Sequence, residues 1–102
     1  MTIPAEVIEF DPEKDARNIA LRGISLAEAE RLLAGFIVER MDDRRDYGET
    51  RIIATGEIDG REFVCIYTRR GDAYRVISLR RAKRKEREVY QEAKTRHATG
   101  EA

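Results

Sequence analysis

The chain has 102 residues, of which 41% are hydrophobic and 39% are charged, and its formal net charge is zero. This length excludes two full domains and allows one domain with one modest core. We expect a single domain over residues 1–102, with an ordered core at about 7–95 and fraying at 1–6 and 96–102.

The charges are unevenly distributed along the chain. Residues 1–68 carry 9 basic and 15 acidic side chains, whereas residues 69–87 carry 9 basic and 2 acidic ones. A basic segment on an acidic body is typical of a protein that binds a nucleic acid or an acidic protein. The zero net charge therefore does not exclude a polyanionic partner.

Cysteine and histidine are too few for several kinds of site. Cys65 is the only cysteine, so no disulfide framework exists, and its setting in "EFVCIYT" indicates a small buried side chain. His97 is the only histidine and lies in the tail that we expect to fray, so we predict no metal and no cofactor. The sequence has neither a membrane-length apolar run nor an export signal, and we expect a cytoplasmic protein without membrane contact.

The N-terminal part predicts a short strand and a first helix. The strand is "EVIEF", after which Asp11 can cap a helix over residues 12–22 that begins with proline and stops at a glycine. The spacing of Ala16, Ile19 and Ala20 predicts that these three residues face the core.

A second helix is predicted to follow at once and to form a helical hairpin with the first. "SLAE" predicts a capping box between Ser25 and Glu28, and Gly35 ends the helix. The buried stripe is expected at Leu26, Ala29, Leu32 and Leu33.

Strands are expected in the central part of the chain and a helix at its end. "FIVERM" predicts one strand, and "RIIATGEI", "REFVCIYT" and "AYRVISL" predict a meander with turns at residues 59–60 and 71–72. A helix is expected at about residues 81–96. The order β-α-α-β-β-β-β-α predicts an α+β fold in which the helical hairpin and the C-terminal helix pack on an antiparallel sheet.

Six of the eight residues in "RRAKRKER", residues 80–87, are basic. Basic side chains in the first turn of a helix are unfavourable by about 0.3–1 kcal/mol each, and like charges four residues apart add to this cost. Such pairs are Arg80 with Arg84, Arg81 with Lys85, and Lys83 with Arg87. A bound phosphate would reverse these contributions, which favours a polyanion site over a solvated face, although an acidic protein would satisfy the same charges.

The segment "DDRRDYGETR", residues 42–51, gathers arginines, carboxylates and a tyrosine without any metal ligand set. RNA cleavage can use such groups, because the 2′-hydroxyl of RNA is an internal nucleophile. Glu49 can act as the base and arginine can stabilise charge on the phosphate. Charged residues also cluster at strand ends in inert proteins, so this pattern alone does not establish a nuclease.

Several motifs in chain order resemble the BrnT family of type II toxins. They are "EFDPEKDARN", "GISLAEAE" and the long run "DDRRDYGETRIIATGEIDGREFVCIYTRRGDAYRVISLRRAKRKERE", followed after Val89 by a tyrosine. The resemblance covers about residues 8–90. It implies a RelE-like fold and a metal-independent endoribonuclease toxin that cleaves RNA, free or on the ribosome, and inhibits translation. It also implies a hetero-oligomer with a BrnA-like antitoxin, which neutralises the toxin, binds DNA and represses the shared operon.

The family motif, carried onto this sequence, falls on Lys14, Asn18, Arg44, Asp46, Tyr47, Gly48, Glu49, Arg51, Tyr67, Arg69, Arg75, Ser78, Arg80, Glu86 and Tyr90. We expect catalytic roles for Arg44, Tyr47, Glu49, Arg51 and Arg80. We expect RNA binding by Lys14, Arg22, Arg69, Arg75, Arg81, Lys83 and Arg84. Tyr67 and Ser78 are equally well explained as satisfied polar groups of the core.

The sequence departs from the family pattern at two places. Phe10 stands where relatives often have tryptophan, and Leu21 and Arg22 stand where they commonly have lysine and histidine. An arginine cannot give up its proton near neutral pH, so the second change removes the usual proton-transfer groups. Two alternatives therefore stay open: a catalytically weak RNA or ribosome binder, and a structural partner whose basic helix start docks an antitoxin.

The acids of the 42–51 segment have a second expected role. Asp42, Asp43 or Asp46 can hold arginines in place. Arg44 and Arg51 would then be directed at phosphate and Glu49 at a ribose hydroxyl.

Overall fold

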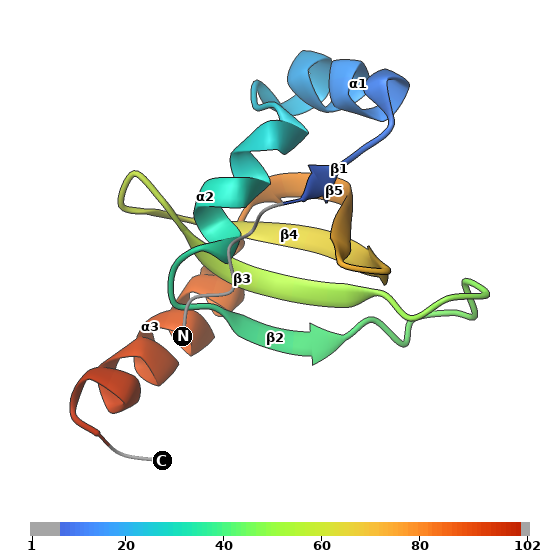
Figure 1. The fold of residues 1–102 in the computed structure, drawn as a ribbon. Helices are drawn as coiled ribbons and strands as arrows, with labels where there is room; N and C mark the ends of the chain where they lie inside the picture. The colour runs from blue at the N-terminus through green and yellow to red at the C-terminus, as the bar shows by residue number, and fades with distance from the viewer. Residues whose placement is uncertain (1–6, 101–102) are drawn as a thin grey trace.

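A computed structural model describes residues 7–100 (Figure 1), so the fraying predicted for 1–6 and 101–102 lies outside the described residues. The elements in chain order are β1 (Ile8–Glu9), α1 (Pro12–Arg22), the 3-10 helix η1 (Leu26–Glu28), α2 (Ala29–Leu33), β2 (Val38–Met41), β3 (Ile52–Ile58), β4 (Arg61–Arg70), β5 (Ala73–Arg81) and α3 (Arg84–Ala98). The predicted α+β class and element order are confirmed.

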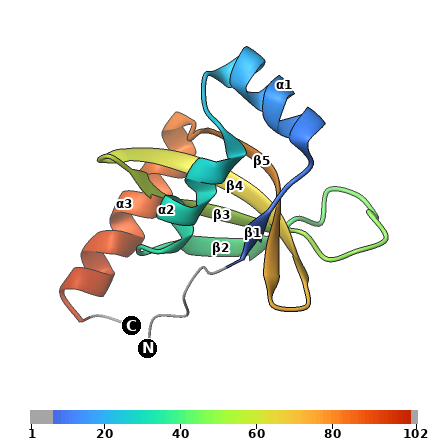
Figure 2. The ribbon, with the colours of Figure 1, turned by 45° about the horizontal axis from the view of Figure 1, so that its top comes forward.

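The strands form one five-stranded sheet in the order β1-β5-β4-β3-β2. The chain runs α1 and α2 over one face of the sheet and α3 over the other (Figures 1 and 2). β3, β4 and β5 form the predicted antiparallel meander, and β2 pairs antiparallel with β3. β1 pairs parallel with β5, so the prediction of a purely antiparallel sheet was wrong. A two-residue strand carries no pattern that fixes its direction, and β1 occupies the edge that β5 leaves open.

The predicted ends of α1 are confirmed, but its predicted buried face is not. The Asp11 carboxylate accepts the amide of Glu13 at 2.9 Å, and Gly23 ends the helix with φ 73°. The stripe of Ala16, Ile19 and Ala20 is exposed. The buried residue is Asn18, whose amide donates to the carbonyls of Ile24 and Leu79, each at 2.9 Å. α1 lies along the edge of β5, where free carbonyls favour a polar donor over an apolar stripe.

The predicted capping box at Ser25 and Glu28 is absent. The Ser25 hydroxyl accepts the amide of Ala27 at 3.1 Å and donates to Asp15 at 2.9 Å. Asp15 also accepts the amide of Leu26 at 2.7 Å. The ionised carboxylate from α1 is a stronger acceptor than a hydroxyl, and the turn it holds is a 3-10 turn followed by the short α2.

The main core lies between the sheet and the segment formed by η1 and α2. Leu26, Ala29 and Leu32 are fully buried as predicted, and Leu33 is half-buried. They pack against the side chains of β3, β4 and β5 on that face, including Cys65. Burial raises the pKa of the Cys65 thiol to about 12, which fits its predicted role as a small hydrophobe.

The C-terminal helix begins later and ends later than predicted. Arg80 and Arg81 belong to β5, so the expected like-charge pairs Arg80 with Arg84 and Arg81 with Lys85 do not lie on a helix, and that part of the argument was wrong. Arg80 instead forms an ion pair with Glu86. The fold itself therefore accounts for one of the basic residues that the sequence alone could explain only by a bound anionic partner. The prediction that His97 lies in a fraying tail was also wrong, since its ring stacks on Phe36 with centroids 4.6 Å apart.

Candidate functional site

The sheet face that α3 partly covers carries polar and cationic side chains in rows across the strands. The register puts Val38, Thr55, Val64 and Arg80 in one row. The next row consists of Arg40, Ile53, Ile66 and Ser78. Ile53, Val64 and Ala82 form a small apolar cluster on this face. The row that contains Val64 is therefore packed under α3. The neighbouring row brings the Arg40 cation and the Ser78 hydroxyl to the same face.

A bulge in β5 determines which arginines reach this face. Val76 pairs with Tyr67 and Ser78 with Ile66, so Ile77 is the extra residue between them. In a regular strand Arg75 and Arg80, five positions apart, would point to opposite faces. The extra residue restores a common side, and both arginines lie on the face of α3.

The loop between β2 and β3 places Arg44 beside this face. The Asp42 side chain is fully buried and accepts two hydrogen bonds from the Arg44 guanidinium, at 2.7 and 2.8 Å. These bonds hold the pKa of Asp42 far below its ordinary value. The Arg44 side chain is still 62% exposed, so a ligand can reach it from the solvent. The expectation that Asp42 holds an arginine is confirmed.

The other loop residues gather around Tyr47. The guanidinium carbon of Arg51 lies 4.0 Å from the centre of the Tyr47 ring, and that of Arg45 lies 5.0 Å from it. The Glu49 carboxylate accepts from Arg51 at 3.4 Å. The carbonyl of Arg51 accepts the amide of Asp42 at 2.8 Å, which ties the two ends of the loop together. Tyr47 and Glu49 therefore lie beside Arg51, directly before the start of β3.

Two remaining acids of the loop differ in their roles. Asp46 accepts the amide of Gly48 at 2.9 Å and so shapes the turn instead of holding an arginine. Asp43 is exposed and has no ion pair among residues 7–100. Only Asp42 fulfils the holding role that we considered for all three.

Arg80 and Glu86 form the second fixed pair on this face. Arg80 donates to both oxygens of Glu86, at 2.9 and 2.8 Å. These hydrogen bonds lower the pKa of Glu86 to about 2. They also raise the pKa of Arg80, and the positive charge of Arg44 opposes that rise. Arg44 and Arg80 therefore lie close enough to repel each other, and each is held by its own carboxylate.

We define the cationic face as Arg40, Arg44, Arg51, Arg75, Arg80 and Lys85. Arg40 and Lys85, which were not predicted as site residues, line the same pocket beside the start of α3. The alternation of β2 could have placed Arg40 on the side of Ile53, but only the packing of α3 brings Lys85 there. Converging guanidinium groups bind phosphate groups and stabilise negative charge on them.

Several residues predicted for RNA binding lie elsewhere. Arg69 stacks on Tyr74 at 4.3 Å and Arg81 lies over Phe63 at 5.6 Å, both on the opposite sheet face. Lys14 and Arg22 are on α1, and Arg22 donates to Asn18 at 3.2 Å. Lys83 and Arg84 stand at the start of α3, beside Lys85. The 42–51 loop thus gathers Arg44, Tyr47, Glu49 and Arg51, and the charge of Arg44 acts on Arg80. Arg75 shares the sheet face of Arg80 and pairs with Glu9 at 3.5 Å. Lys83 and Arg84 border this face, whereas the other predicted residues lie away from it.

The two polar residues with open roles differ in their settings. Tyr67 is buried on the sheet face that α2 covers, and its hydroxyl donates a hydrogen bond to Glu39. Burial raises the pKa of this hydroxyl above its ordinary value. Ser78 is half-buried on the same face as Arg80. Tyr67 is a satisfied core group, whereas Ser78 borders the cationic face.

The chain was compared with family models and with curated proteins, and no curated protein matches it. Residues 10–86 match the family model described as the ribonuclease toxin, BrnT, of type II toxin-antitoxin systems. The chain belongs to the BrnT family. Membership of this BrnT family indicates a ribonuclease toxin with RNA as substrate and an antitoxin protein as partner.

The BrnT match contains the whole cationic face and ends in the first turn of α3. Among residues 7–100, no group of three side chains could hold a metal ion, and no helix is long and apolar enough to cross a membrane. Leu21 and Arg22, which are expected from the sequence to differ from the usual pattern, lie in the last turn of α1, where Leu21 is 79% exposed. Arg22 reaches the sheet through Asn18, which contacts β5 at Leu79, one residue before Arg80.

Proposed function

We propose that this BrnT family member cleaves RNA on the cationic face, inhibits translation as a result, and is neutralised by a BrnA-like antitoxin. One observation carries the proposal: Arg44 and Arg80 come from segments far apart in the chain, the positive charge of Arg44 acts on the pKa of Arg80, and each arginine is fixed by a carboxylate. Placing two like charges together is unfavourable for folding alone, but it suits an anionic group that binds between them.

The proposed reaction is attack of the ribose 2′-oxygen on the adjacent phosphorus. The P–O2′ bond forms, the P–O5′ bond breaks, and the departing O5′ takes a proton from the solvent, to which Glu49 afterwards releases the proton it accepted. The products are a 2′,3′-cyclic phosphate and a 5′-hydroxyl. Arg44 and Arg80 stabilise the charge on the non-bridging oxygens. Glu49 accepts the proton of the 2′-hydroxyl, and Arg51 and Tyr47 orient the Glu49 carboxylate. Because both oxygens of Glu86 accept hydrogen bonds and its pKa is about 2, Glu86 is unsuited to the role of base.

Flanking phosphates are proposed to contact the remaining cations near the two fixed arginines. Arg75 lies beyond Ser78 on the same face, and Lys83 and Arg84 extend it at the start of α3. Lys14, Arg22, Arg69 and Arg81 are outside this surface, and we assign them no contact with the scissile phosphate. The same cations are suited to structured RNA on the ribosome, where phosphate density is high.

We propose that cleavage does not require a metal ion. The nucleophile belongs to the substrate, and arginine side chains provide the positive charge that a metal ion would otherwise provide. Incubation of the purified chain with RNA in excess EDTA tests this step. Cleavage at an unchanged rate is expected, and loss of cleavage that added magnesium restores would contradict it.

The cellular function is tested by expressing the chain alone and together with the product of its neighbouring gene. We expect growth arrest and RNA cleavage when the chain is expressed alone, and relief of both when the neighbour is present. Normal growth with intact RNA during expression of the folded chain alone would overturn the proposed activity.

A second candidate function is that of an RNA or ribosome binder with little catalysis. Its support is the change at Leu21 and Arg22, which leaves no histidine near α1. One variant distinguishes the enzyme from the binder. Glu49→Gln should abolish cleavage and leave RNA binding intact if the chain is an enzyme, whereas a binder shows no cleavage to lose.

A further inference from the structure

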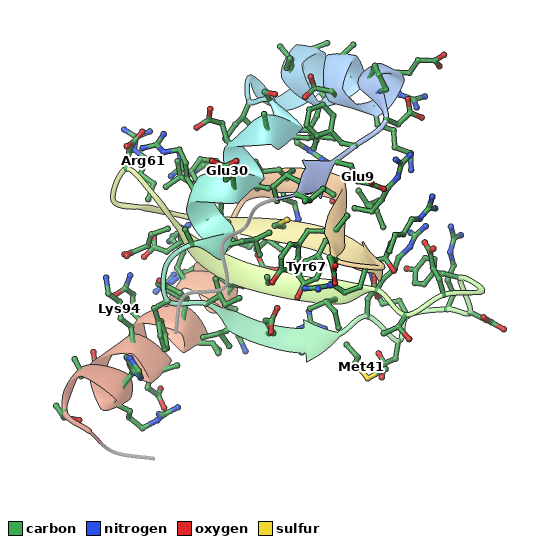
Figure 3. The ribbon with its side chains drawn as sticks, in the orientation of Figure 1. Glu9, Glu30, Met41, Arg61, Tyr67 and Lys94 are labelled. Atoms are coloured by element: carbon green, nitrogen blue, oxygen red, sulfur yellow. The ribbon has the colours of Figure 1, made fainter. Side chains whose placement is uncertain are left out.

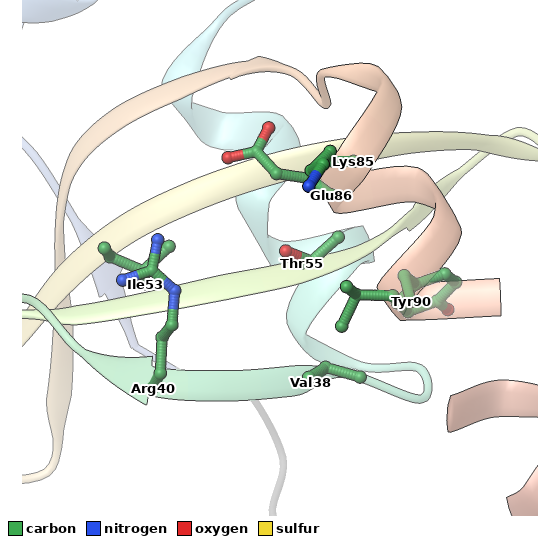
Figure 4. A pocket seen from close by; sticks show the side chains of 8 residues that line it. Val38, Arg40, Ile53, Thr55, Lys85, Glu86 and Tyr90 are labelled. Carbon is green, nitrogen blue, oxygen red and sulfur yellow. The ribbon is translucent and has the colours of Figure 1, made fainter. Parts of the chain in front are cut away.

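A pocket of about 230 Å³ lies between α3 and the strands β2 and β3 (Figure 4). Its apolar lining is Val38, Ile53, Val89 and Tyr90, and its polar lining is Arg40, Thr55, Lys85 and Glu86. Figure 4 shows Arg40 at one end of the pocket and Tyr90 at the other. The pocket is therefore a small apolar recess with a polar rim, on the α3 side of the sheet.

The pocket contains a hydroxyl group that has no partner within the protein. Thr55 is only 8% exposed, and its hydroxyl makes no hydrogen bond within the part of the chain that the structure describes. Among these residues no buried polar side-chain atom lacks a partner, so the Thr55 oxygen is open to the pocket, where a ligand can pair with it. The hydroxyl both donates and accepts, so it suits a ligand with polar atoms at its edge.

The cations at the rim also lack partners. Neither Arg40 nor Lys85 has an ion pair within residues 7–100, and both are exposed. This distinguishes them from Arg44 and Arg80, whose charges are met by Asp42 and Glu86. Two unpaired cations at the entrance favour an anionic ligand whose uncharged part enters the recess.

We propose that the pocket binds one base of single-stranded RNA, with its flanking phosphates on Arg40 and Lys85. This inference rests on the proposed function and adds a specificity subsite to it. The volume is below the roughly 300–1,000 Å³ of pockets for drug-sized ligands, so it suits one ring system instead of a whole nucleotide. Splayed bases of single-stranded RNA are commonly bound in this way, by apolar contact and hydrogen bonds at the base edge.

The pocket is contiguous with the proposed reaction site. Glu86 lines the pocket and is also the partner of Arg80. A strand whose scissile phosphate lies between Arg44 and Arg80 therefore has a neighbouring nucleotide at the pocket. A side chain of the antitoxin is the competing occupant, but an apolar side chain would leave the Thr55 hydroxyl and both cations unpaired.

Methyl NMR of the full chain tests occupancy directly. The probe is a 2′-O-methyl oligoribonucleotide, which cannot be cleaved, together with versions that carry one abasic position at each site in turn. Signals of Val38, Ile53 and Val89 should shift with the intact probe, and one abasic position should remove most of the shift and weaken binding by about 5- to 100-fold.

Two variants separate the subsite from the reaction site. Val89→Asp places a carboxylate at a position that is 59% exposed, and should weaken binding of the probe about tenfold or more. Ile19→Asp is the matched control, on α1 and 47% exposed, and should bind as the wild type does. Thr55→Val removes only the unpaired hydroxyl, and should change the base preference of cleavage while thermal stability stays the same or rises.

The outcomes distinguish the two proposals. Cleavage by the wild type with unchanged base preference in Thr55→Val, and no methyl shifts at the pocket, would overturn the subsite and leave the ribonuclease intact. Methyl shifts with the antitoxin alone would overturn the subsite in favour of a protein contact. Absence of both RNA cleavage and probe binding would overturn the subsite together with the proposed function.

Discussion

At the scale of single residues, Glu86 shows how one carboxylate serves two parts of the fold. It accepts two hydrogen bonds from Arg80 in β5 and one from the amide of Lys83, at 2.7 Å, at the start of α3. The last bond satisfies a helix amide that has no partner within the helix. Glu86 therefore fixes the direction of Arg80 and the first turn of α3 together.

This arrangement makes the stability of the protein depend on pH. The folded-state pKa of Glu86 is lowered from 4.5 to about 2, so the stabilisation is complete above about pH 4.5 and is lost as the pH falls toward 2. Glu86→Gln should lower the free energy of unfolding by about 1–3 kcal/mol at pH 7, and the difference should vanish near pH 2. Urea unfolding between pH 2 and pH 7 measures this difference in the free energy of unfolding. Glu92→Gln is the control, because Glu92 pairs with Arg96 on the exposed surface of α3. A difference that does not change with pH would contradict the assignment.

Gly56 is a second residue with a specific packing role. A Cβ atom at this buried position of β3 would lie 2.9 Å from Cγ of Leu32 and 3.1 Å from a methyl carbon of Ile37. Gly56→Ala should therefore destabilise the protein by about 1–3 kcal/mol through overpacking. Gly35→Ala is the matched control, since its nearest atom would be 3.9 Å away. Equal melting temperatures for the two variants would show that α2 can move away from β3 at no cost.

At the scale of elements, the loop of residues 42–51 is held by pairs within itself. Asp42 fixes Arg44, Asp46 shapes the turn at Gly48, and Tyr47 packs against Arg51. A loop without apolar residues thus has a defined shape at its base. The side chains directed at the proposed substrate depend on this scaffold.

Asp42→Asn tests whether the scaffold matters for activity. The substitution keeps the shape but removes the charge that orients Arg44, so we expect the cleavage rate to fall by about tenfold and RNA binding to weaken less. Asp43→Asn, at the exposed neighbouring position, should cleave at the wild-type rate. Cleavage kinetics together with circular dichroism of both variants provide the measurement. Equal rates in the two variants would show that Arg44 needs no orienting partner.

The elements also show what could be predicted from the sequence and what could not. The meander, its two turns and the cap at Asp11 follow local rules that depend on period and on turn residues. The bulge at Ile77 has no such signal, and without it Arg75 and Arg80 would not share a face. The burial of Asn18 in place of the stripe containing Ile19 is set by free carbonyls on another element. Positions decided by tertiary contacts were the ones that sequence periodicity misplaced.

At the scale of the whole molecule, the fold converts an uneven charge sequence into one cationic surface. Arg40, Arg44 and Arg51 come from the acidic first part of the chain, and Arg75, Arg80 and Lys85 come from the basic segment. The neighbouring acids Asp42 and Glu86 are used as holders, which leaves the exposed part of the face positive. The cationic face therefore contains more arginines than the basic segment of residues 69–87 alone would place there.

This surface predicts a specific salt dependence of RNA binding. Each phosphate contact to single-stranded RNA contributes about 0.7 to the slope of log K against log salt concentration. Arg40→Gln should reduce the slope by about that amount. Arg61→Gln, at the start of β4 directly after the turn from β3 (Figure 3), is the control and should leave the slope unchanged. An unchanged slope in both variants, measured with an uncleavable oligonucleotide, would remove Arg40 from the RNA surface.

The central claim is that RNA is cleaved on the cationic face between Arg44 and Arg80. The most direct test is the rate of RNA cleavage in EDTA by the wild type, Arg44→Ala and Arg61→Ala. Removal of Arg44 leaves the buried Asp42 carboxylate without its partner, so circular dichroism must first show that Arg44→Ala is folded. We predict that Arg44→Ala lowers the rate by about 100-fold or more and that Arg61→Ala cleaves as the wild type does. Cleavage by Arg44→Ala at the wild-type rate would contradict the account.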